Sequence, residues 1–171
     1  NYFKQVEILG SFFWEDPATA LAIMTTDGQQ NPEYYQYIPG IYWYDAPREF
    51  FIIKTAAFIG AFSFNTYTGI ALFFACFSFS GSWAMYLTFI KLYPQLYKSF
   101  AWIVFFVPSV FFWGSGLMKD TLTLGALGWL FWAFYRVFVE KKDLVKGVVI
   151  LLIAAYLIRS VKPYLVCRLL L

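Results

Sequence analysis

Hydrophobic residues are collected into four long runs in the last two thirds of the chain, separated by short polar segments. The runs cover residues 67–90, 99–113, 117–139 and 147–158. A transmembrane helix needs about 20 consecutive apolar residues to cross the hydrocarbon core of a bilayer. The pattern therefore predicts an all-α membrane protein, a polytopic bundle of about four spans. The second span is short and contains Pro108, and the fourth either stops before Pro163 or continues with a kink.

The first 50 residues have a different character. They are polar and aromatic, they hold seven of the ten acidic residues, and periodicity is short-lived, although residues 18–26 could form a short helix after Asp16-Pro17. Tyr and Trp favour the membrane–water interface because each has an apolar body and a polar edge. We therefore predict an extracytoplasmic interfacial loop region at 1–50 and a transmembrane helical bundle at 51–171. Within the latter, residues 48–64 fit an interfacial helix better than a tightly fitted span.

Composition agrees with a membrane protein and removes several kinds of chemistry. Of the 171 residues, 61% are hydrophobic and 13% are charged, whereas soluble domains average about 25% charged residues. The absence of histidine excludes His-ligated haem, the common His-ligated zinc and copper sites, and a histidine general base. Cys76 and Cys167 lie in apolar runs without CxxC spacing and are expected to be free thiols. Because the chain starts with Asn and ends in an apolar run, we expect a fragment of a larger protein.

The loops between the runs predict an orientation. The segments KLYPQLYK and RVFVEKKDLVK lie on the same side of the membrane if the spans alternate, and cytoplasmic loops are enriched in Lys and Arg. These two loops are therefore placed in the cytoplasm, and the acidic N-terminal region on the opposite face. The cations of the two loops are Lys91, Lys98, Arg136, Lys141, Lys142 and Lys146.

The motif PSVFFWGSGLMKD, at residues 108–120, predicts a helical hairpin with charge at its tip. Ser115 is the expected N-cap of the following helix, and Gly116 lies in the turn. Free backbone N–H groups, the helix dipole and Lys119 would together form an anion site suited to phosphate or pyrophosphate. The alternative is that Lys119 extends to lipid headgroups while Asp120 stabilises the first helical turn.

Two further sets of charged residues are predicted on the same non-cytoplasmic face. Arg159 and Lys162 are three residues apart, so they share a face of a continued helix and could join Lys119 around a lipid-linked phosphate. Asp16, Asp27 and Asp45 are candidates for a general base or for holding a divalent cation, although each also fits a turn or cap role. No metal site with defined ligands is predicted.

The hairpin motif, preceded by FNTYTGIALFFACFSFSGSWAMY and followed by a Gly-containing span, resembles the core of bacterial multi-pass proteins that assemble surface polysaccharides. These include GT-C-type glycosyltransferases and O-antigen-polymerase-like proteins, which use sugars carried on polyprenyl phosphate or pyrophosphate. The resemblance covers about residues 50–165. It implies that Asp27 or Asp16 is the catalytic base, and that Ser115, Gly116, Lys119, Arg159 and Lys162 bind the carrier phosphate. The chain departs from the family in having no clear acidic loop signature beyond Glu15-Asp16.

These observations predict an enzyme of the bacterial inner membrane that transfers sugar from a polyprenyl-linked donor on the extracytoplasmic face. Its partners would be membrane lipids, the polyprenyl-linked sugar and other membrane subunits, and no nucleic acid. An alternative is a non-catalytic subunit that packs into a larger membrane complex through its Gly and Ser faces. A transporter of anions or lipids is a third, because transporters also place helix ends at anion sites.

Overall fold

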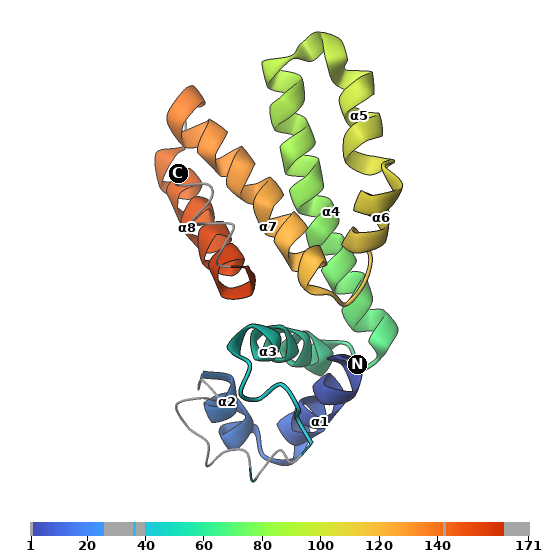
Figure 1. Ribbon diagram of the computed structural model, residues 1–171. Coiled ribbons are helices and arrows are strands. Elements are labelled where there is room, and N and C mark those ends of the chain that lie inside the picture. Colours follow the sequence, from blue (N-terminus) through green and yellow to red (C-terminus); the bar gives the residue numbers. More distant parts are fainter. Residues whose placement is uncertain (1, 26–35, 37–39, 142, 163–171) are drawn as a thin grey trace. The chain divides into compact units, whose positions relative to one another are not determined.

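The computed structural model describes residues 2–25, 36, 40–141 and 143–162, and these residues form helices and connecting turns without strands. The chain divides into two compact units, Asn1–Phe73 and Phe74–Leu171. The helices and turns of the described residues confirm the predicted all-helical class. In chain order the α-helices are α1 (Tyr2–Glu15), α2 (Pro17–Thr25), α3 (Pro47–Phe62), α4 (Tyr67–Leu92), α5 (Tyr97–Phe105), α6 (Pro108–Gly114), α7 (Lys119–Phe134) and α8 (Leu144–Val161) (Figure 1).

Three helical segments are long and apolar enough to cross a membrane: α4, Lys119–Glu140 and α8. A fourth candidate is a broken pair, in which Pro94–Phe105 and Pro108–Gly114 meet at a bend of 53°. Pro108 opens α6 at a position where its missing N–H costs nothing, and it cannot continue the ladder of α5. The chain is therefore a multi-pass helical membrane protein in contact with lipid.

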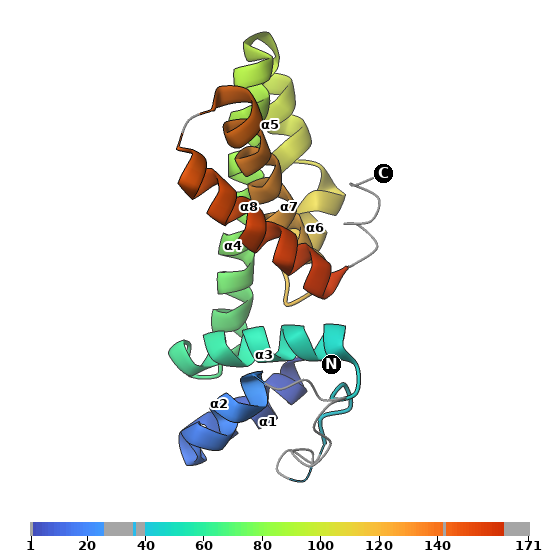
Figure 2. The same cartoon turned by 90° about the vertical axis from the view of Figure 1, so that its left-hand side faces the viewer.

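The first unit contains helices where a loop region was predicted. The short helix after Asp16-Pro17 is confirmed as α2, but α1 was missed. Tyr2, Val6, Leu9 and Phe13 recur at intervals of three and four residues, which is the signal for an amphipathic helix. Val6 and Leu9 are fully buried. Packing of α1 against α2 and α3 gives this unit its own core (Figure 2).

Helix α3 ends at a tight corner built around Asn65. The residue is left-handed, with φ of 53°, and its backbone N–H donates to the Gly60 carbonyl at 2.9 Å. Its side chain occupies the space that a Cβ on Gly10 or Gly60 would need, so both glycines leave room for the amide between α1 and α3. With 16 residues, α3 is shorter than the roughly 20 needed for a crossing.

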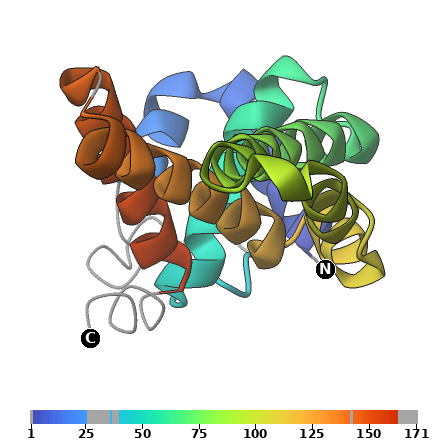
Figure 3. The same cartoon turned by 90° about the horizontal axis from the view of Figure 1, so that it is seen from above.

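In the second unit, α7 lies between α4 and α8 (Figures 1 and 3). The backbones of α4 and α7 touch, because a Cβ added to Gly81 would overlap the Gly125 carbonyl and one added to Gly128 would overlap that of Gly81. The Trp129 indole N–H donates to Ser80 Oγ across the same contact at 3.0 Å. Small residues allow this approach, as predicted for Gly125 and Gly128.

The two loops predicted to share a side do so. Lys91 at the end of α4 pairs with Glu140 at the end of the π-helical segment Tyr135–Glu140, with Nζ and Oε1 2.6 Å apart. Arg136 of that segment pairs with Asp143 and lies over the Trp132 ring. Spans that alternate in direction must bring these ends together, so the observed contacts confirm the alternation. The cytoplasmic placement of this side stays a prediction.

We expect Gly81→Ala and Gly128→Ala to lower the free energy of unfolding in detergent by about 2–3 kcal/mol, since each added methyl meets backbone that cannot move aside. Gly116→Ala is the matched control, because its new Cβ would meet only Met118 side-chain atoms at 3.6 Å or more. Denaturant titration followed by far-ultraviolet circular dichroism measures both. Equal stability of all three variants would contradict the backbone contact.

Candidate functional site

The predicted hairpin between α6 and α7 is present, and Thr121 holds it closed. The turn runs from Ser115 to Met118, and the Met118 N–H donates to the Gly116 carbonyl at 2.9 Å. The buried Thr121 hydroxyl faces two carbonyl oxygens of the hairpin, those of Trp113 at 2.9 Å and Gly116 at 2.7 Å. A residue in the first turn of α7 therefore positions the residues that precede the helix.

The expected capping role of Ser115 is wrong. Met118 occupies the N-cap position of α7, whereas Ser115 caps the C-terminus of α6. The Ser115 hydroxyl donates to the Phe112 carbonyl at 3.2 Å, so it is directed to the preceding helix. The reason is the length of the turn, because α7 begins four residues after Ser115, beyond the reach of a cap.

The start of α7 and the end of α8 meet through an ion pair. Lys162 Nζ contacts Asp120 Oδ1, joining residues that are 42 positions apart in the chain. Lys162 is the C-cap of α8, and Asp120 lies in the first turn of α7. This pair brings Lys162 to the first turn of α7, which also contains Lys119, and it adds a carboxylate that the predicted phosphate site did not include.

Arg159 lies one turn before Lys162 on α8 and is exposed. Its guanidinium makes no ion pair with any residue in the described part of the chain. Among the described residues, this end of the second unit carries three cations, Lys119, Arg159 and Lys162, and one carboxylate, Asp120.

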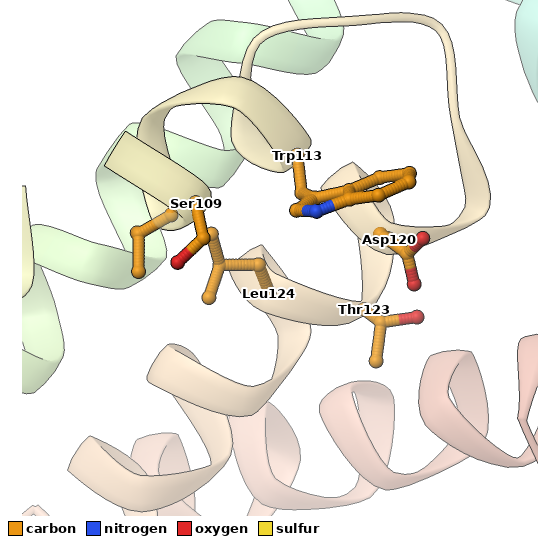
Figure 4. Close-up of a pocket in the computed structure, with 6 residues that line it drawn as sticks. Ser109, Trp113, Asp120, Thr123 and Leu124 are labelled. Atoms are coloured by element: carbon orange, nitrogen blue, oxygen red, sulfur yellow. The ribbon is translucent and has the colours of Figure 1, made fainter. Parts of the chain in front are cut away.

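A cleft of about 420 Å³ opens between α6 and α7 (Figure 4). Asp120 and Thr123 are on its α7 side, and Trp113 reaches in from α6 with its indole beside them. The Thr123 hydroxyl donates to the Lys119 carbonyl at 2.8 Å, which leaves the Asp120 carboxylate as the charged group of the wall. The remaining lining residues are Ser109, Val110 and Leu124.

Sequence reasoning gave Asp120 only a role in the helix dipole. The signal that it lines a site was its spacing from Trp113, which the hairpin folds back beside it. The spacing brings Trp113 and Asp120 together only with a turn of this length, so neither residue by itself indicates the site.

In the first unit, Asp16 has a capping role. Its carboxylate accepts the Thr19 hydroxyl at 2.6 Å and the Thr19 backbone N–H at 3.3 Å, so it caps α2 ahead of Pro17. These bonds favour the charged form, the hydroxyl most, and lower the pKa of Asp16 below its ordinary value of 3.8. Asp27, the other candidate base, lies outside the described residues. Asp45 lies in the turn before α3.

In the described ranges, no group of three acidic or cysteine side chains converges to hold a metal ion. Comparison with protein-family models, with curated proteins and with solved structures finds no match for this chain. The resemblance to polysaccharide-assembly proteins therefore stays a prediction.

We expect Thr121→Val to lower the free energy of unfolding by about 1–2 kcal/mol, because two carbonyl groups of the hairpin lose their donor. Thr123→Val is the control, since its hydroxyl bonds only within α7, where the Lys119 carbonyl lies in a regular helical turn. Thermal unfolding and limited proteolysis at residues 114–118 report on both variants. An equal loss of stability in the two variants would contradict the role of Thr121 in holding the hairpin closed.

Proposed function

We propose that this chain is part of an inner-membrane glycosyltransferase or polysaccharide polymerase, which transfers a sugar from a polyprenyl-phosphate-linked donor on the extracytoplasmic face. The observation that carries the proposal is the contact between the α7 start and the α8 end, beside the α6–α7 cleft. It places positive charge, a helix N-terminus and an apolar cleft at one end of a lipid-embedded helix pair.

The carrier phosphate would bind at this end. Lys119 and Arg159 supply charge, and the first turn of α7 supplies backbone N–H groups and the positive end of the helix dipole. Lys162 is held by Asp120 and would serve mainly to keep α8 in place. The prenyl chain would lie along the apolar side of α8, where Val149, Leu152 and Ile153 are exposed.

The proposed reaction breaks the bond between the donor sugar and the phosphate oxygen. A carboxylate takes the proton of the acceptor hydroxyl, the hydroxyl oxygen bonds to the anomeric carbon, and the carrier phosphate leaves with the electron pair. Cations at the phosphate stabilise the charge that develops there. A depressed pKa makes Asp16 a weaker base, so Asp27 is the first candidate for the carboxylate.

The rival role, an accessory subunit, relied on free Gly and Ser faces. Gly81, Gly125 and Gly128 are already used by the contact between α4 and α7 inside the chain. Those faces are therefore not available to another subunit, which favours the enzyme over this particular mode of assembly.

We expect Lys119→Met to weaken binding of a phosphate-headed polyprenol at least about tenfold, equivalent to about 1.4 kcal/mol. Lys146→Met is the control, since Lys146 is an exposed cation in α8 close to the opposite end of that helix. Binding is measured with protein in nanodiscs, comparing polyprenyl phosphate with uncharged polyprenol. Unchanged affinity in Lys119→Met would remove the phosphate site.

The two roles of Asp16 can be separated by substitution. Asparagine is an equally good N-cap but cannot act as a base. Asp16→Asn should therefore leave α2 intact, whereas Asp16→Ala should speed hydrogen exchange of the backbone amides in the first turn of α2. Because the pKa of Asp16 is lowered in the folded chain, the capping contribution is complete above the ordinary pKa and is lost as pH falls through the folded value. Sugar transfer retained in Asp16→Asn and lost in Asp27→Asn would assign the base to Asp27.

A further inference from the structure

A second cavity lies between α4 and the broken α5–α6 pair. Its volume is about 210 Å³, and it is separate from the cleft that contains Asp120, although Val110 and Leu124 line both. Aromatic and aliphatic side chains make up most of its wall. Three serines are the exception: Ser78 and Ser82 of α4, and Ser115 of the hairpin turn, whose hydroxyl donates to the Phe112 carbonyl.

Ser78 and Ser82 are buried, with exposed fractions of 2% and 5%, yet their hydroxyls make no hydrogen bond with any residue the structure describes. Other hydroxyls of the same helix behave differently. Ser80 donates to the Phe77 carbonyl at 2.7 Å and Thr88 to the Ala84 carbonyl at 3.0 Å, the usual bonds of such residues inside helices. Ser78 and Ser82 are one turn apart, so both are directed to the same side, into the cavity.

The break between α5 and α6 lies against the same cavity. Val104 and Phe105 in the last turn of α5, and Val110 in the first turn of α6, line it. A helix end leaves carbonyl or N–H groups without partners in the helix, and in a bilayer such groups must be satisfied by protein or by water. The cavity therefore combines two hydroxyls lacking partners with residues on either side of a helix break.

We propose that this cavity is a water-binding site inside the membrane domain, in which Ser78 and Ser82 hold water against the helix break. The volume is sufficient for several molecules, since each occupies about 30 Å³ of liquid. A buried water needs two to four polar partners, and the hydroxyls and freed backbone groups supply them. This inference does not depend on the proposed glycosyl transfer.

Glycine at position 114 keeps the space open. A Cβ there would lie 3.0 Å from Ser78 Oγ and 3.1 Å from Leu124 Cδ2. Ser115, the first residue of the turn that carries the predicted phosphate site, also lines the cavity. Hydration at this place would let the α5–α6 pair bend without leaving polar backbone in contact with lipid.

The test uses cysteine reactivity in the full chain, with both native cysteines replaced by alanine. Ser78→Cys and Ser82→Cys are each labelled with a small, charged methanethiosulfonate reagent, which reacts with the thiolate and so needs water at the thiol. Native Cys76 is the matched control, tested with only Cys167 replaced, because it lies two residues from Ser78 and is exposed on the membrane-spanning helix α4, where it would face lipid and not water. We expect the introduced thiols to react at least about tenfold faster than Cys76.

A rate no higher than that of Cys76 at both positions would show a dry cavity and overturn the proposal. Circular dichroism and size-exclusion chromatography establish that each variant is folded. Hydrogen exchange on the unaltered chain gives a second, independent readout: the amides of residues 109–111 should exchange faster than those of residues 124–130 of α7. Equal protection of the two segments would also overturn the proposal, whatever the fate of the cysteine variants.

Discussion

The backbone contact between α4 and α7 is the constraint on which the second unit depends. Three glycines allow the two helices to approach until their carbonyls and α-carbons touch. Close packing of this kind is needed because the hydrophobic effect does not hold helices together inside a lipid bilayer. The Ser80–Trp129 hydrogen bond fixes the rotation of α7 at this crossing. Once α7 is set, α8 on one side and the α6 hairpin on the other follow from it.

Ion pairs lie at both ends of the continuous helical segment Lys119–Glu140, which consists of α7 and the π-helical turn after it. Asp120 binds Lys162 of α8 at its start, and Glu140 binds Lys91 of α4 at its end. Each pair joins segments that are far apart in sequence, so together they define the register of three helices. The proposed phosphate site uses one of these ends, where the Asp120–Lys162 pair would hold together the two helices that carry Lys119 and Arg159.

Much of the fold was predictable because long apolar runs are a strong signal. The boundaries of α4, α7 and α8 agree with the hydropathy pattern to within a few residues, and Gly125 and Gly128 pack as expected. Local chemistry was harder. Ser115 looks like an N-cap in isolation, and only the length of the turn shows that it belongs to α6.

The candidate site was predictable in part. That the start of α7 and the end of α8 lie on one side followed from the alternation of spans, whereas the pairing of Lys162 with Asp120 required knowledge of which faces α7 and α8 present to each other. The same holds for α4, where Ser80 packs on α7 and Ser78 and Ser82 line a cavity. The sequence shows that α4 contains small residues, but not which of them pack on α7 and which line the cavity.

The interruption of the second crossing also affects the surrounding bilayer. At about 1.5 Å per residue, Pro94–Phe105 covers about 18 Å, and the bend of 53° leaves α6 adding only about 6 Å more along the same direction. The pair is thus several ångströms shorter than a hydrocarbon core of about 30 Å. A crossing of this length would be accommodated by local thinning of the bilayer, by extension of flanking polar side chains to the headgroups or by oligomerisation, and thinning would bring the headgroup layer closer to the hairpin between α6 and α7.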